Sequence, residues 1–474
     1  MKKIIKSIFP ILCVLAGAMT AALSAAAAPA PFPPTPNPAQ LKWHKAEQLM
    51  FVHFGMKTFY PSDNHMGSGR EDPKKFNPVH FDADQWVAAA KAGGFKGIVL
   101  TTKHHDGFCN WPTKTTDHCV RSSSWKDGKG DIVRELVEAC RKGGIYFGFY
   151  VSILDHNYNL HGSDKFDNYG DFYHEQIKEL STEYGPIDEY WFDGFCSEEL
   201  RVPYEKIAEL IRTAQPHAVV YDSNTLVKYL PDRCLRWAGT HGGLGADQNY
   251  RVEVDGALRW YPNEPSLILQ GNWFYDGKPI KSLEEIQEDY LTTVGNGVTP
   301  LMNVAPNQDG LIDEASVARL KEYKAWVDAL HANDLANGEG VRVTASSVRG
   351  DDPTFAADRA IDGDYETYFA TDDGVTEATI EINLGRLQEI DGFILQEYIP
   401  LGQRVDGFAI ECFVDGDWKT VFEGQRIGYK RILLEGRASA KEQEFPATDR
   451  VRLRIENAMA CPLISSFQVI GGME

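Results

Sequence analysis

Short apolar runs and amphipathic runs alternate along the chain between about residue 43 and residue 335. The apolar runs lie at residues 50–54, 97–101, 145–152, 187–192, 218–221, 267–269 and 298–304. The runs with helical periodicity lie at residues 84–92, 131–142, 169–184, 204–213, 282–294 and 314–330. This alternation predicts an α/β fold with a parallel sheet and helical crossovers. About eight such units fit a closed (β/α)8-type barrel, with an open doubly wound sheet as the alternative.

Unusual polar residues follow the ends of three predicted strands. His53 lies at the end of the first, the pair His104-His105 follows the second, and Asp193 ends the fourth. Active sites of (β/α) barrels lie at the carboxyl ends of the strands. This placement favours the barrel, and no G-x-G-x-x-G motif follows the first strand to support a nucleotide-binding open sheet.

After about residue 337 the pattern changes to short runs of alternating polar and apolar residues, such as residues 378–384 and 408–413, separated by turn residues. Period-two alternation over short runs predicts an all-β sandwich. The sequence Asn337-Gly338-Glu339-Gly340 is the predicted boundary. We therefore expect a barrel over residues 43–336 and a β-sandwich over residues 337–474.

The first 28 residues are predicted to be an export signal. Three lysines lie near its start, residues 8–23 are apolar, and an alanine run supplies a cleavage site of the A-x-A type. A membrane anchor is disfavoured because the apolar core is short. Residues 29–42 follow as a proline-rich spacer that we expect to be a stiff tether rather than a packed segment. We expect export to the periplasm or the extracellular space, with no membrane span in the mature chain.

Charge and cysteine content exclude several classes of partner. The net charge of -20 argues against binding nucleic acid or an anionic membrane. No cysteines form a close C-x-x-C pair, so a zinc site is not expected. Of the eight cysteines, Cys13 lies in the export signal, which leaves an odd number in the mature chain and at least one thiol without a partner in the chain.

Asp193 is the candidate nucleophile or base. It follows an apolar strand, and Gly194 after it allows the chain to turn away. The alternative is that Asp193 caps the following helix. Trp191 offers a flat apolar face suited to a sugar ring, or it belongs to the barrel core.

His104 and His105 address one pocket only if the strand is already ending, since successive strand residues point to opposite faces. The alternatives are one core and one exposed histidine, or a zinc or iron site, for which no regularly spaced third ligand appears. Loop aromatics such as Trp111 and Trp273 suit carbohydrate faces. Histidine, aspartate and tryptophan at one end of a barrel favour glycoside chemistry, in which two carboxyl groups divide the work.

Several motifs together resemble the α-L-fucosidases of glycoside hydrolase family 29. They are Phe51-Val52-His53-Phe54-Gly55, Lys103-His104-His105-Asp106-Gly107-Phe108-Cys109, Trp111-Pro112, Gly128-Lys129-Gly130-Asp131, Tyr190-Trp191-Phe192-Asp193-Gly194, Trp273-Phe274-Tyr275 and Leu301-Met302-Asn303-Val304-Ala305-Pro306. The similarity covers roughly residues 43–335, and the order of segments is similar to the branch that favours 3- or 4-linked fucose and carries a β-sandwich. The resemblance implies an exo-acting, retaining enzyme on a fucosylated glycan substrate, with no cofactor for catalysis.

The resemblance also implies roles for individual residues. Asp193 would be the nucleophile, and Trp273 would contact the apolar face of the sugar. His53, His104 and His105 would hydrogen-bond the hydroxyl groups of fucose.

Two positions depart from the family pattern. His241 stands where relatives carry the acid/base Glu, and His65 precedes Met66-Gly67 where they carry a pocket Glu. His241 itself is one candidate acid, since an imidazolium is a competent donor near neutral pH. The other candidates are the carboxyl groups of Asp247, Glu253 and Glu264. A glycosidase for a different sugar, or a carbohydrate-binding protein with lost catalysis, are the remaining alternatives.

The C-terminal region resembles the galactose-binding, discoidin-like sandwich of coagulation factors. The matching residues are residues 357–369 and Ile382-Asn383-Leu384-Gly385. In such domains a loop like Asp362-Gly363-Asp364 can hold a structural calcium ion through oxygen ligands, and a plain turn is the alternative. The domain either binds glycan or braces the barrel.

Overall fold

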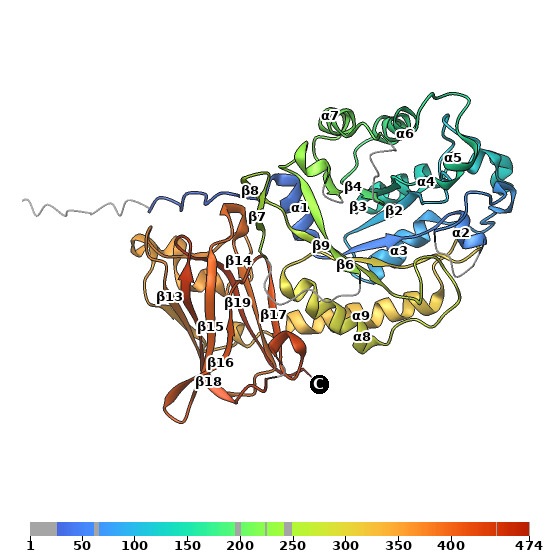
Figure 1. The fold of residues 1–474 in the computed structure, drawn as a ribbon. Coiled ribbons are helices and arrows are strands. Elements are labelled where there is room, and N and C mark those ends of the chain that lie inside the picture. The colour runs from blue at the N-terminus through green and yellow to red at the C-terminus, as the bar shows by residue number, and fades with distance from the viewer. Residues whose placement is uncertain are drawn as a thin grey trace, which may run out of the picture.

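The computed structural model describes residues 26–60, 66–194, 201–222, 225–240, 249–441 and 443–473, and shows two domains (Figure 1). The first is a closed barrel with the strand order β1-β10-β9-β6-β5-β4-β3-β2, in which every neighbouring pair is parallel. The barrel prediction is confirmed. Its strands are β1 (Leu49–Val52), β2 (Gly97–Lys103), β3 (Tyr146–Ser152), β4 (Glu189–Asp193), β5 (Val219–Asp222), β6 (Cys234–Thr240), β9 (Asn263–Ile268) and β10 (Leu301–Asn303).

Six long helices cover much of the outside of the barrel, each where helical periodicity predicts one. They are α3 (Ala83–Ala92), α4 (Ile132–Gly143), α6 (Tyr169–Glu183), α7 (Tyr204–Ala214), α8 (Leu283–Thr292) and α9 (Glu314–Ala332). Side-chain caps define several of their starts: Asp82, Asp131, Asn168 and Ser282 each accept a hydrogen bond from a backbone N–H of the first turn. Three shorter helices are additional to these six: α1 (Pro38–Ala46), α2 (Met56–Phe59) and α5 (His156–His161).

Two connections between neighbouring strands differ from the expected strand–helix pattern. A single 3₁₀ turn (Leu226–Lys228) joins β5 to β6 among the described residues, and an antiparallel hairpin of β7 (Arg251–Val254) and β8 (Ala257–Trp260) stands between β6 and β9. The sequence pattern did not predict β6 or this hairpin. The hairpin signal was overlooked: Val252 and Val254 alternate with charged residues, and Asp255-Gly256 is a typical two-residue hairpin turn.

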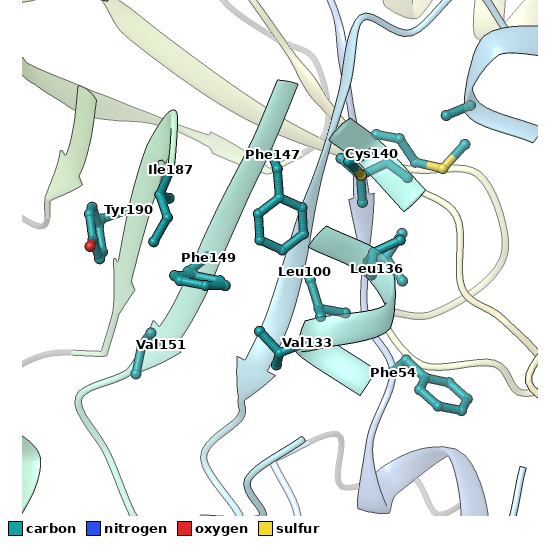
Figure 2. Packing of buried hydrophobic residues seen from close by; sticks show 14 of the residues in the cluster. Phe54, Leu100, Val133, Leu136, Cys140, Phe147, Phe149, Val151, Ile187 and Tyr190 are labelled. Atoms are coloured by element: carbon teal, nitrogen blue, oxygen red, sulfur yellow. The ribbon is translucent and has the colours of Figure 1, made fainter. Parts of the chain in front are cut away.

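Apolar side chains pack between the barrel and its helices. In Figure 2, Leu100 of β2 and Phe147 and Phe149 of β3 face Val133, Leu136 and Cys140 of α4. All six are buried. A separate cluster fills the inside of the barrel and includes Phe51, Tyr150, Trp191 and Tyr221. The strands are therefore apolar on both faces, as expected for a parallel sheet covered by helices.

The second domain is the predicted β-sandwich. It has a five-stranded sheet of order β11-β13-β18-β15-β16 and a four-stranded sheet of order β12-β19-β14-β17, both antiparallel. Ile380, Ile382 and Leu453 of one sheet pack against Phe393 and Phe467 of the other. The strands are β11 (Arg342–Ala345), β12 (Phe369–Ala370), β13 (Ala378–Gln388), β14 (Gly392–Glu397), β15 (Val405–Val414), β16 (Asp417–Gly424), β17 (Arg431–Leu434), β18 (Thr448–Ala458) and β19 (Leu463–Ile470).

The proline-rich segment is packed against the protein, which differs from the expected stiff, unpacked tether. Helix α1 begins at Pro38, so the last residues of the predicted spacer are helical. The preceding residues hydrogen-bond to the C-terminal domain, for example through Phe32 N to Leu401 O at 2.8 Å. The segment packs because its backbone groups find partners on that domain, a feature that proline content alone does not reveal.

The part of the chain that the structure describes contains no helix long and apolar enough to cross a membrane.

Candidate active site

The predicted site residues gather at one end of the barrel, where the strands finish. His53 follows β1, His104 and His105 follow β2, and Asp193 is the last residue of β4. Trp273 follows β9, and Asn303 is the last residue of β10. Because all these strands are parallel, their carboxyl ends form one rim, and the site lies within it.

Asp193 is held by three contacts. Tyr150 Oη donates to its Oδ2 at 2.6 Å, and His105 Nε2 lies 3.5 Å from the same oxygen. The Gly194 amide donates to Oδ1 at 2.7 Å. The side chain of Asp193 is 36% exposed, so it is oriented yet reachable from solvent. The next described helix, α7, begins after Pro203, so Asp193 does not cap it.

Tyr150 is a neutral hydrogen-bond donor at this position. Burial, and then the negative charge of Asp193, raise the pKa of its phenol well above the ordinary value. Its ring also stacks on Trp191, with centroids 5.3 Å apart and an 18° angle between the planes. The hydroxyl of Tyr150 therefore keeps its proton and points it at the carboxylate.

His105 connects Asp193 to the end of β3. Its Nδ1 lies 2.6 Å from Ser152 Oγ. Ser152 Oγ also accepts a hydrogen bond from the Leu154 amide at 3.0 Å. Since Nε2 faces the carboxylate of Asp193, the favourable neutral tautomer carries its proton on Nε2 and accepts the hydroxyl proton of Ser152 at Nδ1.

β2 ends at Lys103, so His104 and His105 come after the strand and can both face the site. Their ring centroids are 4.2 Å apart. His104 lies nearly parallel to Tyr150, with ring centroids 5.6 Å apart, and perpendicular to Phe274, with ring centroids 5.0 Å apart. Both histidines are more than nine-tenths buried, and this packing orients them.

His53 is fixed from the opposite side by β10. Its Nδ1 lies 2.7 Å from Asn303 Oδ1, and Asn303 Nδ2 donates to Trp273 O at 2.7 Å. The rings of His53 and Trp273 have centroids 4.9 Å apart. Asn303 thus joins two predicted sugar-binding residues from different strands.

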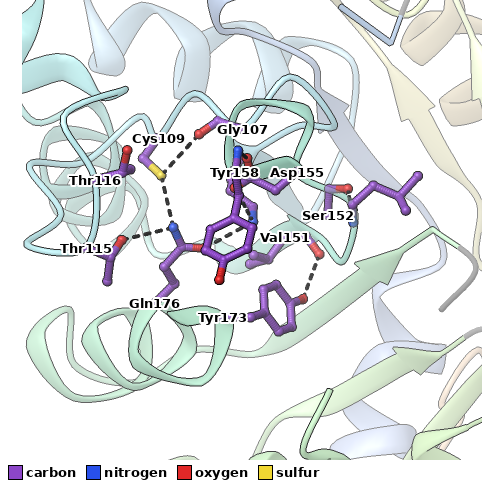
Figure 3. Close-up of polar contacts among 12 residues, drawn as sticks. Gly107, Cys109, Thr115, Thr116, Val151, Ser152, Asp155, Tyr158, Tyr173 and Gln176 are labelled. Atoms are coloured by element: carbon purple, nitrogen blue, oxygen red, sulfur yellow. Dashed lines mark hydrogen bonds and ion pairs between the residues drawn. The ribbon is translucent and has the colours of Figure 1, made fainter. Parts of the chain in front are cut away.

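The segment that follows the two histidines is anchored to α6, where Gln176 hydrogen-bonds to Cys109 and Thr115 (Figure 3). Lys103, which immediately precedes His104 and is fully buried, donates to Asp155 Oδ2 at 3.1 Å and to Gln176 Oε1 at 3.0 Å. Gln176 Nε2 in turn donates to Thr115 Oγ1 at 3.0 Å. This network holds the end of β2 in place and so fixes the backbone position from which His104 and His105 extend.

Trp191 belongs to the interior of the barrel, one layer below Asp193. It is 6% exposed and stacks on Tyr221 with centroids 3.8 Å apart. Its Nε1 donates to Glu264 Oε1 at 2.8 Å. Trp191 therefore belongs to the barrel core, the second of the two interpretations above. Trp191 and Asp193 are two residues apart on β4, so they share a face of the strand but lie in successive layers of the barrel.

Glu264 is also an interior residue. It accepts a second indole hydrogen bond, from Trp43 Nε1 at 2.8 Å, and it is fully buried. Its side chain hydrogen-bonds to that of Glu189, which accepts from Tyr146 Oη at 2.8 Å. Burial raises the pKa of Glu264 to about 7, and burial together with the charge of Glu264 raises that of Glu189 well above the ordinary value. The pair therefore holds at least one proton near neutral pH, below the site.

Two other predicted residues are not brought to the site. Trp111 is 1% exposed and donates from Nε1 to Glu179 Oε2 of α6 at 2.8 Å, so it packs outside the barrel. Glu253 lies on the β7–β8 hairpin. The base of that hairpin adjoins the amino ends of β6 and β9, since Gln40 Nε2 donates both to Cys234 O and to Trp260 O. Glu253 is thus at the opposite end of the barrel from Asp193.

His65, His241 and Asp247 lie outside the described residues. Among the residues that the structure does describe, no group of three or more His, Cys, Asp or Glu side chains is arranged to hold a metal ion. In the C-terminal loop, Asp362 accepts from the Asp364 amide at 2.9 Å and from Thr367 Oγ1 at 2.7 Å, and Arg359 lies 3.5 Å from its Oδ2. These are the contacts of a plain turn, and calcium binding there stays a prediction.

Comparison with known families gives two matches along the chain. The α-L-fucosidase family profile matches residues 37–331, and the F5/8 type C domain profile matches residues 342–462. Among curated proteins, α-L-fucosidase 1 of Arabidopsis thaliana is 32% identical over 91% of this chain and 86% of its own length. A putative α-L-fucosidase 1 of Oryza sativa subsp. japonica is 34% identical over 92% of this chain and 85% of its own length.

Solved structures show the same arrangement of domains. A putative α-L-fucosidase from Bacteroides thetaiotaomicron superposes with a TM-score of 0.84 at 31% identity, covering 94% of this chain and 99% of that one. A Ruminococcus gnavus family 29 fucosidase in complex with fucose superposes with a TM-score of 0.85 at 27% identity, covering 95% of this chain and 98% of that one.

Proposed function

Because the chain belongs to the α-L-fucosidase family of glycoside hydrolases, we propose that it releases terminal α-L-fucose from glycans with Asp193 as the nucleophile of a retaining mechanism. The observation that carries this proposal is the position of Asp193, which ends β4 in the rim of the barrel with one carboxylate oxygen bound by Tyr150 and faced by His105. A carboxylate that is oriented, partly exposed and faced by a histidine suits attack on a sugar.

The reaction has two steps. A carboxylate oxygen of Asp193 attacks the anomeric carbon, the bond to the leaving oxygen breaks, and an acid gives that oxygen a proton. Water then attacks the fucosyl-enzyme ester, with the same acid acting as base, and fucose leaves with its original anomeric configuration. The hydrogen bond from Tyr150 keeps the carboxylate in the attacking orientation and stabilises the carboxylate that is regenerated.

We propose His241 as the acid/base. Two of the three competing carboxyl groups are unsuitable where they lie: Glu253 is at the amino ends of the strands, and Glu264 is enclosed by two indoles. Asp247, which shares its loop with His241, is the remaining alternative. A histidine titrates near neutral pH and can both give and take the proton.

His53, His104 and His105 are proposed to hydrogen-bond the hydroxyl groups of fucose, and Trp273 to cover its apolar face. The exposed fraction of each histidine is small, at 3%, 6% and 7%, which fits residues that line a recess rather than an open surface. His65, which replaces a pocket carboxyl of relatives, is proposed to share this role.

We further propose that the chain is exported and that its natural substrate carries fucose in a 3- or 4-linkage, as in the branch that it resembles. Two other functions remain to be tested against this one: hydrolysis of a different deoxy- or galacto-configured glycoside, and sugar binding without catalysis because the usual acid/base Glu is absent.

The test uses an aryl α-L-fucoside and a 3- or 4-linked fucosyl oligosaccharide with the parent, Asp193→Ala and His241→Ala. The aryl leaving group needs little protonation, so it tests the nucleophile alone, whereas the oligosaccharide also needs the acid. We expect Asp193→Ala to lose both activities and His241→Ala to lose mainly the second. If the parent cleaves neither substrate, calorimetric titration with fucose separates a binding protein from an enzyme for another sugar.

A further inference from the structure

Asn303 extends the pairing between β10 and β1 beyond the ends of the two strands. Phe51 of β1 is the register partner of Asn303, and Val304 N donates to Phe51 O at 2.9 Å. The side chain of Asn303 supplies the next partner, since its Oδ1 accepts from the backbone N–H of His53 at 3.2 Å. Asn303 is 1% exposed, so protein groups rather than solvent surround its amide.

Two backbone groups fix which end of the Asn303 amide is the oxygen. The N–H of His53 only donates, so it needs Oδ1. The carbonyl of Trp273 only accepts, so it needs Nδ2, which donates to it at 2.7 Å. The opposite orientation would place a donor against a donor and an acceptor against an acceptor. The backbone therefore determines the orientation of this amide.

The orientation of the amide determines the protonation of the His53 ring. Nδ1 of His53 lies 2.7 Å from Asn303 Oδ1, which is an acceptor. A neutral imidazole carries one proton, and that proton must be on Nδ1 to form this hydrogen bond. Nε2 of His53 is then the accepting nitrogen of the ring. Trp273 and Phe274 pack against the ring, with centroids 4.9 Å and 5.5 Å away, and hold its plane.

His105 has the opposite arrangement. Its Nδ1 faces the hydroxyl group of Ser152, and its Nε2 lies on the side of Asp193, so its neutral tautomer carries the proton on Nε2. The rim of the barrel therefore presents an accepting nitrogen at His53 and a donating N–H at His105. These two groups require opposite hydrogen-bonding partners.

We propose that Asn303 determines specificity by positioning a proton: it holds the proton of His53 on Nδ1, which makes Nε2 an acceptor that requires a hydroxyl donor from the sugar. This inference rests on the proposed binding of fucose by His53. The sugar hydroxyl that meets His53 donates its proton and keeps its lone pairs for donors elsewhere in the recess. A ligand with hydrogen or fluorine at that position cannot donate to Nε2, and the lost hydrogen bond weakens its binding.

The first experiment reads the tautomer directly and needs no ligand. Nitrogen-15 chemical shifts, measured at pH 8 on protein labelled in its histidines, distinguish a protonated from an unprotonated ring nitrogen. The signals of His53 are those that disappear in His53→Phe. We expect Nδ1 to be protonated and Nε2 to be unprotonated in the parent. A neutral ring with its proton on Nε2 overturns the proposal.

His44 is the matched reference within the same chain. It is a fully buried histidine whose Nε2 accepts from Trp260 Nε1 at 3.1 Å. Its neutral tautomer therefore also carries the proton on Nδ1, for a reason unrelated to Asn303. The shifts of His44 should resemble those of His53 in the parent.

Asn303→Asp separates the two histidines. The other titratable groups that face His53 are His104 and Tyr150, with ring centroids 5.6 Å away in each case. A carboxylate at position 303 favours the doubly protonated ring, so both nitrogens of His53 should give protonated shifts while those of His44 stay unchanged. Unchanged shifts of His53 in this variant would mean that residue 303 does not control the ring.

The second experiment tests the consequence for ligands. The parent is titrated calorimetrically with L-fucose and with analogues in which one ring hydroxyl is replaced by hydrogen or by fluorine. The position that meets His53 is the one at which deoxygenation costs no further affinity in His53→Ala. We expect both analogues at that position to bind the parent about 5- to 50-fold more weakly than fucose, because neither donates to Nε2.

A fluorinated analogue that binds as tightly as fucose at that position, or the lack of any position coupled to His53, overturns the ligand requirement. Absence of fucose binding altogether would refute the proposed function and the ligand requirement with it. The imidazole shifts decide the effect of Asn303 on His53 in either case, so the two failures are distinguishable.

Discussion

Tyr150 Oη lies 2.6 Å from Asp193 Oδ2 and donates its proton to that carboxylate from the neighbouring strand. We predict that Tyr150→Phe lowers kcat/KM for an aryl α-L-fucoside about 10- to 100-fold, the range expected for one hydrogen bond to a charged group. The loss should appear mainly in kcat, because the hydrogen bond orients the attacking carboxylate.

Tyr190→Phe is the matched control for this prediction. Tyr190 precedes Trp191 on β4, faces outward and donates to Ser181 Oγ at 2.7 Å. The substitution therefore removes an equivalent buried hydrogen bond of a phenol, but away from the site. Its kcat/KM should match that of the parent. Equal changes in both variants would mean that Tyr150 acts only through stability.

Removing the nucleophile should abolish turnover while leaving the fold intact. We predict that Asp193→Ala lowers kcat about 10⁴-fold or more on the aryl substrate, since the loss of a nucleophile removes the covalent route. Added azide should restore part of the rate and give a fucosyl azide of inverted configuration. Asp167→Asn, on an exposed loop, should keep full activity. A fully active Asp193→Ala would refute the assignment.

Ser152 should set the protonation of His105. In the parent, we expect a nitrogen NMR signature of the tautomer with the proton on Nε2, because Ser152 Oγ donates to Nδ1 at 2.6 Å. Ser152→Ala should mix the two tautomers and lower kcat/KM about tenfold, and Ser152→Thr, which keeps the hydroxyl, should restore both readouts. An unchanged tautomer in Ser152→Ala would show that the hydroxyl does not control it.

The buried pair Glu189 and Glu264 should make stability fall as the pH rises. Burial raises the pKa of Glu264 from an ordinary 4.5 to about 7, so the folded state holds protons that the unfolded chain releases. The contribution of Glu264 to the free energy of unfolding is therefore fully present below about pH 4.5 and is lost as the pH rises through about 7. Melting temperature measured from pH 5 to pH 9 reports this slope.

Glu189→Gln should flatten that slope, because an amide resembles the protonated acid and can still accept from Tyr146 and donate to Glu264. We expect the melting temperature of the variant to match that of the parent at pH 5 and to exceed it at pH 8. The increase should be about 2–4 °C for each kcal/mol that ionisation of the buried pair costs the parent. Glu138→Gln, on the exposed face of α4, is the control. A parent whose melting temperature does not fall toward alkaline pH would contradict the shared proton.

Most of the barrel was predictable because its strands and helices each repeat one periodicity. The rim residues were predictable for the same reason, since His53, His104, His105 and Asp193 are polar residues placed directly after apolar runs. Tyr150 and Ser152 were missed, although they lie two residues apart at the end of a strand and therefore share the inner face. Nothing in the sequence marked Tyr150 and Ser152 as site residues, because tyrosine and serine are common in strands.

The tryptophans show where the sequence was insufficient. Trp111 and Trp191 both lie beside catalytic motifs, yet one packs against Glu179 of α6 and the other donates to Glu264 inside the barrel. Which layer a side chain occupies depends on the strand register and on partners more than 60 residues away in the chain, as here. Asn303 was missed for a similar reason, because its partner His53 is 250 residues distant.

Residues 26–37, which lie along the C-terminal domain, also constrain the order in which the molecule can fold. Ala26 contacts a residue 326 positions later, and Ala30 contacts one 374 positions later. Translation produces residues 26–37 long before their partners Asp352 and Arg404. The barrel can therefore close before this segment can dock. Contacts of such high sequence separation form late and slowly. A segment that is synthesised early is thus among the last to reach its native position, because its docking requires the C-terminal domain to have been made.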